Sequence, residues 1–120
     1  MKNIMKKQIR DLFKDHQKTL EDGLWFSGYY HEGKYREWYA SGNLFKESFY
    51  KNHERNGEDK LWNEDGTLIA LRHFKDGKRD GEYKQWDNNG ILQLHSWFEN
   101  NEEVVDFMDH PEYKKRYNIE

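Results

Sequence analysis

A repeat of 24 residues constrains the fold of this chain more than any other feature. Three glycines, Gly33, Gly57 and Gly81, stand 24 residues apart. Four further positions keep this spacing, and they hold tryptophans (Trp38, Trp62, Trp86), glycines (Gly42, Gly66, Gly90), leucines (Leu44, Leu68, Leu92) and rings (Tyr50, Phe74, Phe98). A fixed period in this range is typical of stacked repeats, in which each unit contacts mainly its neighbours. It predicts a single domain with units 33–56, 57–80 and 81–104.

Each unit is expected to form a β-hairpin. Asn89-Gly90 lies between two runs rich in aromatic and aliphatic residues, which is a strong hairpin signal. In a type I turn with a left-handed glycine in a bulge, Asp87 pairs with Ile91. The same count predicts one cross-strand Trp–Leu pair in each unit: Trp38–Leu44, Trp62–Leu68 and Trp86–Leu92.

Further from the turn, this register predicts a glycine opposite a ring in every unit. The expected pairs are Gly33–Phe49, Gly57–His73 and Gly81–Trp97. A strand glycine leaves a gap that a ring from the facing strand can cover. Between units, connections of odd length would keep all the tryptophans on one face, because strand side chains alternate. The left-handed residues of these connections are expected at His53, Gly77 and Asn101.

These hairpins predict a mainly β fold, a single twisted antiparallel meander of about eight strands over residues 24–107. Residues 1–22 show a different pattern, with apolar side chains on one side at helical spacing and lysines on the other. This predicts an amphipathic α-helix that ends at Gly23 and packs on the sheet. The segment 109–120, with Pro111 suited to a first helical turn, is expected to be a tail or a short helix.

Composition excludes several classes of function. The chain has 120 residues and no cysteine, so it carries neither disulfides nor a thiolate metal site. The net charge is −3, and the repeat region is acidic, which argues against nucleic-acid binding. The sequence has no apolar run of membrane-spanning length and no apolar segment typical of a signal peptide. We therefore expect a cytoplasmic protein.

The sequence also offers little catalytic chemistry. Its six histidines lack the close pairs typical of zinc ligands, so no metal or cofactor is expected. Adjacent carboxylates such as Glu64-Asp65 fall at predicted turns, where solvent surrounds them. The few serines lack the surroundings of a nucleophile. The prediction is a protein that is not an enzyme.

The repeated pattern resembles a known family. Glycine, a ring at the third position, then tryptophan, glycine and leucine, as in Gly81, Tyr83, Trp86, Gly90 and Leu92, are similar to the variant MORN repeat. This is the form found in bacterial proteins labelled as YwqK-family antitoxin components. The resemblance covers residues 33–104 and implies hairpin repeats with a role in binding. Asp59 departs from the pattern, because it replaces the ring.

The two faces of the predicted sheet suggest a function. One face is expected to carry the tryptophans, the leucines and the rings Tyr50, Phe74 and Phe98, and the helix can cover only one face. The other face is the predicted partner-binding surface, formed by Tyr35, Phe45, Phe49, Ile69, Leu71, His73, Tyr83 and Trp97. A large apolar patch usually marks an interaction site. The leading hypothesis is a non-enzymatic protein-interaction module, and antitoxin-like binding of a partner protein is one form that this function could take. The alternatives are a homodimer closed through this face and a membrane-surface adaptor acting through the basic helix.

Overall fold

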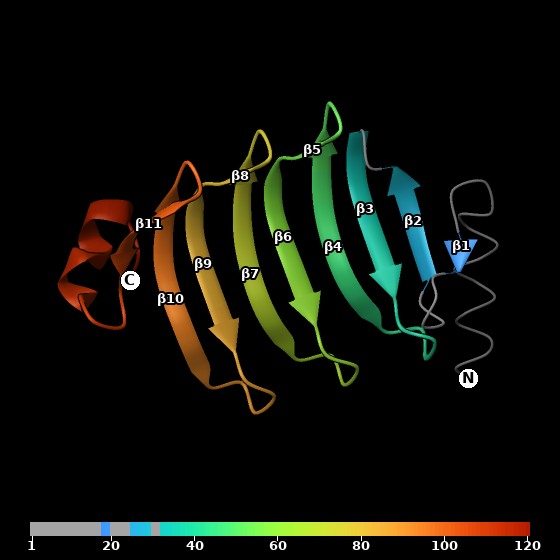
Figure 1. Ribbon diagram of the computed structural model, residues 1–120. Helices are drawn as coiled ribbons and strands as arrows, with labels where there is room; N and C mark the ends of the chain where they lie inside the picture. The colour runs from blue at the N-terminus through green and yellow to red at the C-terminus, as the bar shows by residue number, and fades with distance from the viewer. Residues whose placement is uncertain (1–17, 20–24, 30–31) are drawn as a thin grey trace.

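The computed structural model describes residues 18–19, 25–29 and 32–120, and their strands form one antiparallel sheet (Figure 1). The strands are β1 (Lys18–Thr19), β2 (Trp25–Tyr29), β3 (Glu32–Trp38), β4 (Leu44–Lys51), β5 (Glu54–Arg55), β6 (Gly57–Trp62), β7 (Leu68–Lys75), β8 (Lys78–Arg79), β9 (Gly81–Trp86), β10 (Leu92–Glu99) and β11 (Glu102–Asp106). Neighbours in sequence are neighbours in space, in the order β1-β2-β3-β4-β6-β7-β9-β10-β11, while β5 pairs with β4 and β8 with β7. The predicted mainly β hairpin meander is therefore confirmed.

The two ends of the chain differ from the repeat region. The predicted helix over 1–22 lies outside the described residues, except for Lys18–Thr19. Those two residues form β1 and pair with β2, so the helix prediction is wrong at this point. Beyond the sheet, Pro111–Tyr117 form a short 3-10 helix, η1, with the proline in its first turn.

The turn within each hairpin has the predicted geometry. The Asp87 amide donates to the Ile91 carbonyl at 2.9 Å, and the Gly90 amide donates to the Asp87 carbonyl at 3.0 Å. Gly42, Gly66 and Gly90 have φ values of 97°, 93° and 81°, which glycine adopts without steric cost. All three predicted Trp–Leu pairs form.

Directly after these pairs, each hairpin contains a β-bulge that the sequence did not predict. One residue of the second strand is left without a Cα partner, namely Phe45, Ile69 or Gln93. The rest of the register therefore shifts by one residue. The glycines lie opposite Tyr50, Phe74 and Phe98, and the predicted pairs with Phe49, His73 and Trp97 are wrong.

The connections between units also differ from the prediction. The predicted left-handed residues are confirmed, with φ of 70° at His53, 83° at Gly77 and 72° at Asn101. The residue before each one also has a positive φ, and the strand pair resumes directly on both sides, as between Lys51 and Glu54. These are two-residue loops rather than connections of odd length. The bulge supplies the extra residue that keeps equivalent positions on one face.

The bulge decides which side chains share a face. Alternation along β3, β6 and β9 places the tryptophans on one side and the third residue of each unit on the other. We call the first side the tryptophan face, with Trp38, Trp62 and Trp86, and the second side the tyrosine face, with Tyr35, Asp59 and Tyr83. The rings Tyr50, Phe74 and Phe98 pair with the glycines on the tyrosine face, so their predicted place beside the tryptophans is wrong.

Gly57 and Gly81 do leave room for rings, but for rings of the preceding unit. A Cβ added to Gly57 would lie 3.5 Å from Phe49 Cβ, and one added to Gly81 would lie 3.1 Å from His73 Cβ. Both glycines have φ of 113°, which side-chain-bearing residues rarely adopt. Glycine therefore permits close packing across the boundary between two units.

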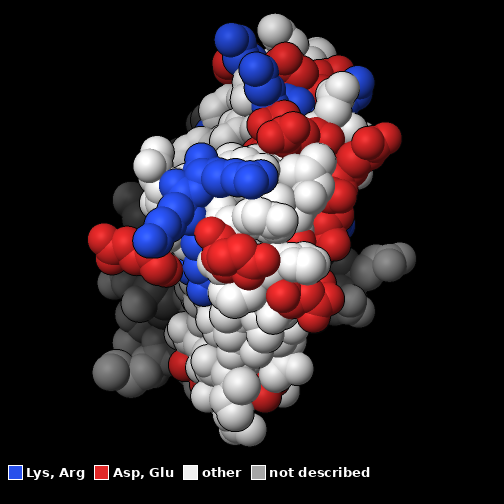
Figure 2. Space-filling view, turned by 90° about the vertical axis from the view of Figure 1, so that its left-hand side faces the viewer, with Lys and Arg blue, Asp and Glu red and all other residues white. Residues whose placement is uncertain are grey.

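The C-terminal segment closes the tryptophan face at the last strands. Phe107 is 2% exposed and lies against His95, with ring centroids 4.9 Å apart. Tyr117 of η1 stacks on Trp97 at 4.4 Å. Viewed from this end, acidic and basic side chains are interspersed over the upper part of the surface (Figure 2). Mixed charge at the end of a sheet opposes edge-to-edge pairing.

Candidate functional site

The tyrosine face is organised in rows that run across the strands. Tyr35 pairs with Ser48 in the first unit, and Tyr83 pairs with Ser96 in the third. The Tyr35 ring lies edge-on to Tyr50 at 6.0 Å. Tyr35 is 1% exposed, so it serves packing.

The middle unit replaces this Tyr–Ser pair by an ion pair. Asp59 pairs with Arg72 across β6 and β7, and its carboxylate accepts Arg72 Nε at 2.8 Å and a second guanidinium nitrogen. Ser48 also donates to Asp59. Asp59 is 1% exposed, and a carboxylate so deeply buried needs such partners.

Two arginines flank one ring beside this ion pair. Arg55 lies 5.2 Å and Arg72 lies 5.4 Å from the centroid of Phe74. Burial lowers the pKa of Arg55, but its hydrogen bond with Tyr50 and the charge of Asp59 outweigh burial, so the pKa rises. The Arg55 guanidinium therefore stays charged on the tyrosine face.

A third cation, Lys46, belongs to the same cluster. Burial lowers the pKa of Lys46, and the charges of Arg55 and Arg72 lower it further, while Asp59 and Glu37 partly oppose them. Among the described residues, Lys46 Nζ forms no ion pair. Three cations thus share two carboxylates, and the cluster keeps an excess of positive charge.

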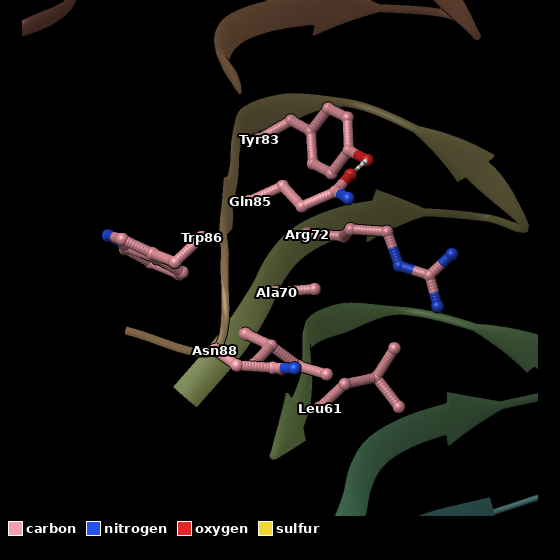
Figure 3. A pocket seen from close by; sticks show the side chains of 8 residues that line it. Leu61, Ala70, Arg72, Tyr83, Gln85, Trp86 and Asn88 are labelled. Carbon is pink, nitrogen blue, oxygen red and sulfur yellow. Dashed lines mark hydrogen bonds between the residues drawn. The ribbon is translucent and has the colours of Figure 1, made fainter. Parts of the chain in front are cut away.

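A pocket of about 370 Å³ lies beside this cluster, over β6, β7 and β9. Its lining residues are Leu61, Ile69, Ala70, Arg72, Tyr83, Gln85, Trp86 and Asn88. Figure 3 shows Leu61, Ala70, Arg72, Tyr83 and Gln85 on one side of the sheet, with the Trp86 side chain on the other. Its volume falls within the range of small ligand sites.

The pocket has its origin in one small side chain. Ala70 occupies the position that Lys46 has in the first unit and Leu94 in the third. A methyl group leaves the space that a longer side chain would fill. The wall beside it is polar, because Tyr83 Oη donates to Gln85 Oε1 at 2.8 Å and Arg72 stands next to Tyr83. The arrangement is an apolar hollow with hydrogen-bond donors at its rim.

The structure divides the predicted partner-binding surface. Ile69 and Tyr83 line the pocket, and Tyr35 is buried on the same face. Phe45, one of the bulge residues, has its ring 5.0 Å from Tyr39. The remaining four, Phe49, Leu71, His73 and Trp97, lie on the tryptophan face opposite Lys34, Lys60, Glu58 and Glu82. Their placement on one face with Tyr35 and Tyr83 is wrong because of the bulge.

Sequence reasoning missed the residues that make the pocket and its charge. Leu61, Ala70, Arg72 and Gln85 carry no motif of their own. The available signal was a comparison of equivalent positions, where Arg72 stands in place of Ser48 and Ser96 while Asp59 replaces a ring. Asp59 and Arg72 therefore both differ from the repeat pattern and lie opposite each other, which indicates that the tyrosine face differs in the middle unit.

The described part of the chain shows neither a side-chain group placed for a metal ion nor a helix that could cross a membrane. No three His, Asp or Glu side chains there are placed to hold a metal ion. None of the described helices is long and apolar enough to span a membrane. The site offers apolar contact, hydrogen-bond donors and positive charge.

Comparison with known proteins agrees with this fold. The family model of the MORN repeat variant matches residues 32–52 and 79–101, less than half of the chain. MORN repeats are non-catalytic modules that generally bind proteins or membranes. No curated protein matches the sequence. The first and third hairpins resemble this repeat, while the middle hairpin, which supplies half of the residues that line the pocket, lies outside the matched segments.

Proposed function

We propose that this protein is a non-enzymatic interaction module that binds a partner protein at the pocket on its tyrosine face. The observation that carries the proposal is the hollow over Ala70, an open site of about 370 Å³ with apolar walls and a polar rim. Protein interfaces concentrate their binding energy where an anchor side chain fills such a pocket. The regular rows on either side supply a rigid frame for it.

This proposal changes the surface that the sequence suggested. On the tryptophan face, Trp97 already stacks on Tyr117, and Lys34 Nζ lies 5.6 Å from the centroid of the Phe49 ring. These rings are partly used within the chain, which favours the tyrosine face over a homodimer closed through the other side. An antitoxin-like role, in which the partner is a toxin that the module neutralises, is a special case of the same proposal.

The two alanines of the chain offer a matched test. Ala70→Leu fills the hollow, and Ala40→Leu makes the same change at an exposed turn residue of the first hairpin. Proteins that co-purify with the parent chain are quantified by mass spectrometry, and the leading partner is purified for a binding titration. We expect Ala70→Leu to weaken binding at least tenfold and Ala40→Leu to leave it unchanged, with the fold of both checked by circular dichroism. Equal binding by the parent and Ala70→Leu would show that the pocket is not the binding site.

A further inference from the structure

The position of the pocket relative to Lys46 limits what can bind there. One row across the sheet reads Lys46, Leu61, Ala70 and Gln85, each opposite the next. Neighbouring strands are about 4.8 Å apart, so the backbones of Lys46 and Ala70 lie about 10 Å from one another. An extended chain covers that distance in about three residues at about 3.3 Å per residue. The hollow and the cation are therefore within reach of one short segment.

The charge along this row favours an anionic group. Arg72 forms part of the pocket wall and shares Asp59 with Ser48. Lys46 lies beyond Leu61, without an ion pair to any described residue. The crowding of Lys46 by Arg55 and Arg72, which helps to lower its pKa, would be relieved by an added carboxylate.

The remaining lining suits a peptide. Leu61, Ile69 and Ala70 offer apolar contact for one side chain. The Tyr83 hydroxyl donates a hydrogen bond to the amide oxygen of Gln85, so the amide NH2 group of Gln85 remains a donor that can bind a backbone carbonyl. Apolar contact, a donor for the backbone and a cation about three residues away form a linear set of features.

We infer that the pocket binds an extended peptide segment of the partner in which an apolar side chain lies within about three residues of a carboxylate. The apolar side chain fills the hollow over Ala70, and the carboxylate meets Lys46 and Arg72. This inference rests on the proposed function, because it names the chemistry of the partner at that site.

A random hexapeptide library displayed on phage, selected on the full chain, tests the inference. The expected outcome is enrichment of peptides with an apolar residue followed or preceded by Asp or Glu within three positions. The most enriched peptide is then synthesised with its acidic residue and with the corresponding amide. We expect the amide peptide to bind the parent about tenfold more weakly, the size of effect typical of a hydrogen bond to a charged group.

Variants on the two faces make the test specific. Lys46→Met removes the charge but keeps the stem, and it should reduce the difference between the acidic and amide peptides to less than threefold. Lys60→Met is the matched control, because Lys60 lies on the tryptophan face opposite Glu47 and Leu71. It should preserve the tenfold difference.

The other outcomes overturn one proposal or both. If Ala70→Leu abolishes the enrichment but the enriched peptides show no preference for Asp or Glu, the carboxylate contact is refuted and the proposed site stands. An acidic preference that survives in Lys46→Met refutes the role of that residue. Displacement of the peptide by phenylacetate at equal concentration would indicate a small acid as ligand instead. No enrichment, or enrichment unchanged by Ala70→Leu, refutes a peptide site at this pocket.

Discussion

Exchanging the ion pair of the middle unit for the pair found in its neighbours should leave the fold nearly as stable as before. The perturbation is the double substitution Asp59→Tyr with Arg72→Ser. It would create a row in which tyrosine and serine alternate through all three units, as they do for Tyr35 with Ser48. Side chains of these sizes already pack at the equivalent positions on both sides.

The single substitutions should behave very differently. Arg72→Ser leaves the Asp59 carboxylate, which is 1% exposed, without its guanidinium partner. Asp59→Tyr leaves Arg72, whose side chain is 19% exposed, without its carboxylate. Breaking a buried ion pair by removing one partner costs about 3–5 kcal/mol. Replacing both partners by groups that pack well is often neutral, so we expect the double variant within about 1 kcal/mol of the parent.

Urea denaturation followed by tryptophan fluorescence measures these differences. Independent effects would add to about 6–10 kcal/mol in the double variant, a large share of the total stability of about 5–15 kcal/mol expected for a domain. A coupling energy of several kcal/mol therefore separates the two cases. A double variant that loses as much stability as both single variants together would refute the equivalence of the three units. Should a single variant not fold, a folded double variant still demonstrates the compensation.

Two further predictions concern the packing between units and at the C-terminal end. Gly81→Ala should destabilise by about 1–3 kcal/mol, because φ is 113° and the new Cβ would lie 3.1 Å from His73 Cβ. Gly33→Ala should lower the stability less, since its Cβ would meet open space. Thermal unfolding of both variants measures the difference, and an equal or larger loss of stability in Gly33→Ala would contradict this reasoning. Burial lowers the pKa of His95 below its ordinary 6.5, despite the hydrogen bond with Glu82. The imidazole therefore binds a proton more readily in the unfolded chain than in the folded one. The stability of the fold should fall as the pH drops from 7 to 5. His95→Gln should flatten that decline, and an identical decline in parent and variant would exclude His95 as its source.

The sequence was sufficient for the repeat, the turns and the nearest cross-strand pairs. Asn89-Gly90 and its equivalents determine the turn, and the turn fixes the pairs closest to it, such as Trp86–Leu92. The bulge that follows has no such signature, because Phe45, Ile69 and Gln93 share neither size nor polarity. A single extra residue reverses the face of every side chain beyond it.

The site escaped prediction for the same reason. Its residues come together only when the strands of adjacent units pair in the true register, which brings Lys46 opposite Leu61 and Ala70 opposite Gln85. Exposed rings are typical of interaction surfaces, so the sequence favoured Phe49 and Trp97, whereas the pocket depends on the absence of a large side chain at Ala70. A small residue in a repeat is informative only against its equivalents.

The middle unit carries its departures from the repeat at neighbouring points of one face. Asp59 and Arg72 replace a Tyr–Ser pair, and Ala70 stands two residues before Arg72 on the same side of β7. If these departures serve only packing, replacing Asp59 and Arg72 by the Tyr–Ser pair of the neighbouring units would leave the affinity for the peptide unchanged. If they serve the partner, the double variant Asp59→Tyr with Arg72→Ser should fold as well as the parent and yet bind the acidic peptide about threefold more weakly, since Arg72 no longer meets the carboxylate while Lys46 still does. Stability retained with binding reduced would assign the ion pair to recognition, whereas unchanged binding would limit the carboxylate contact to Lys46.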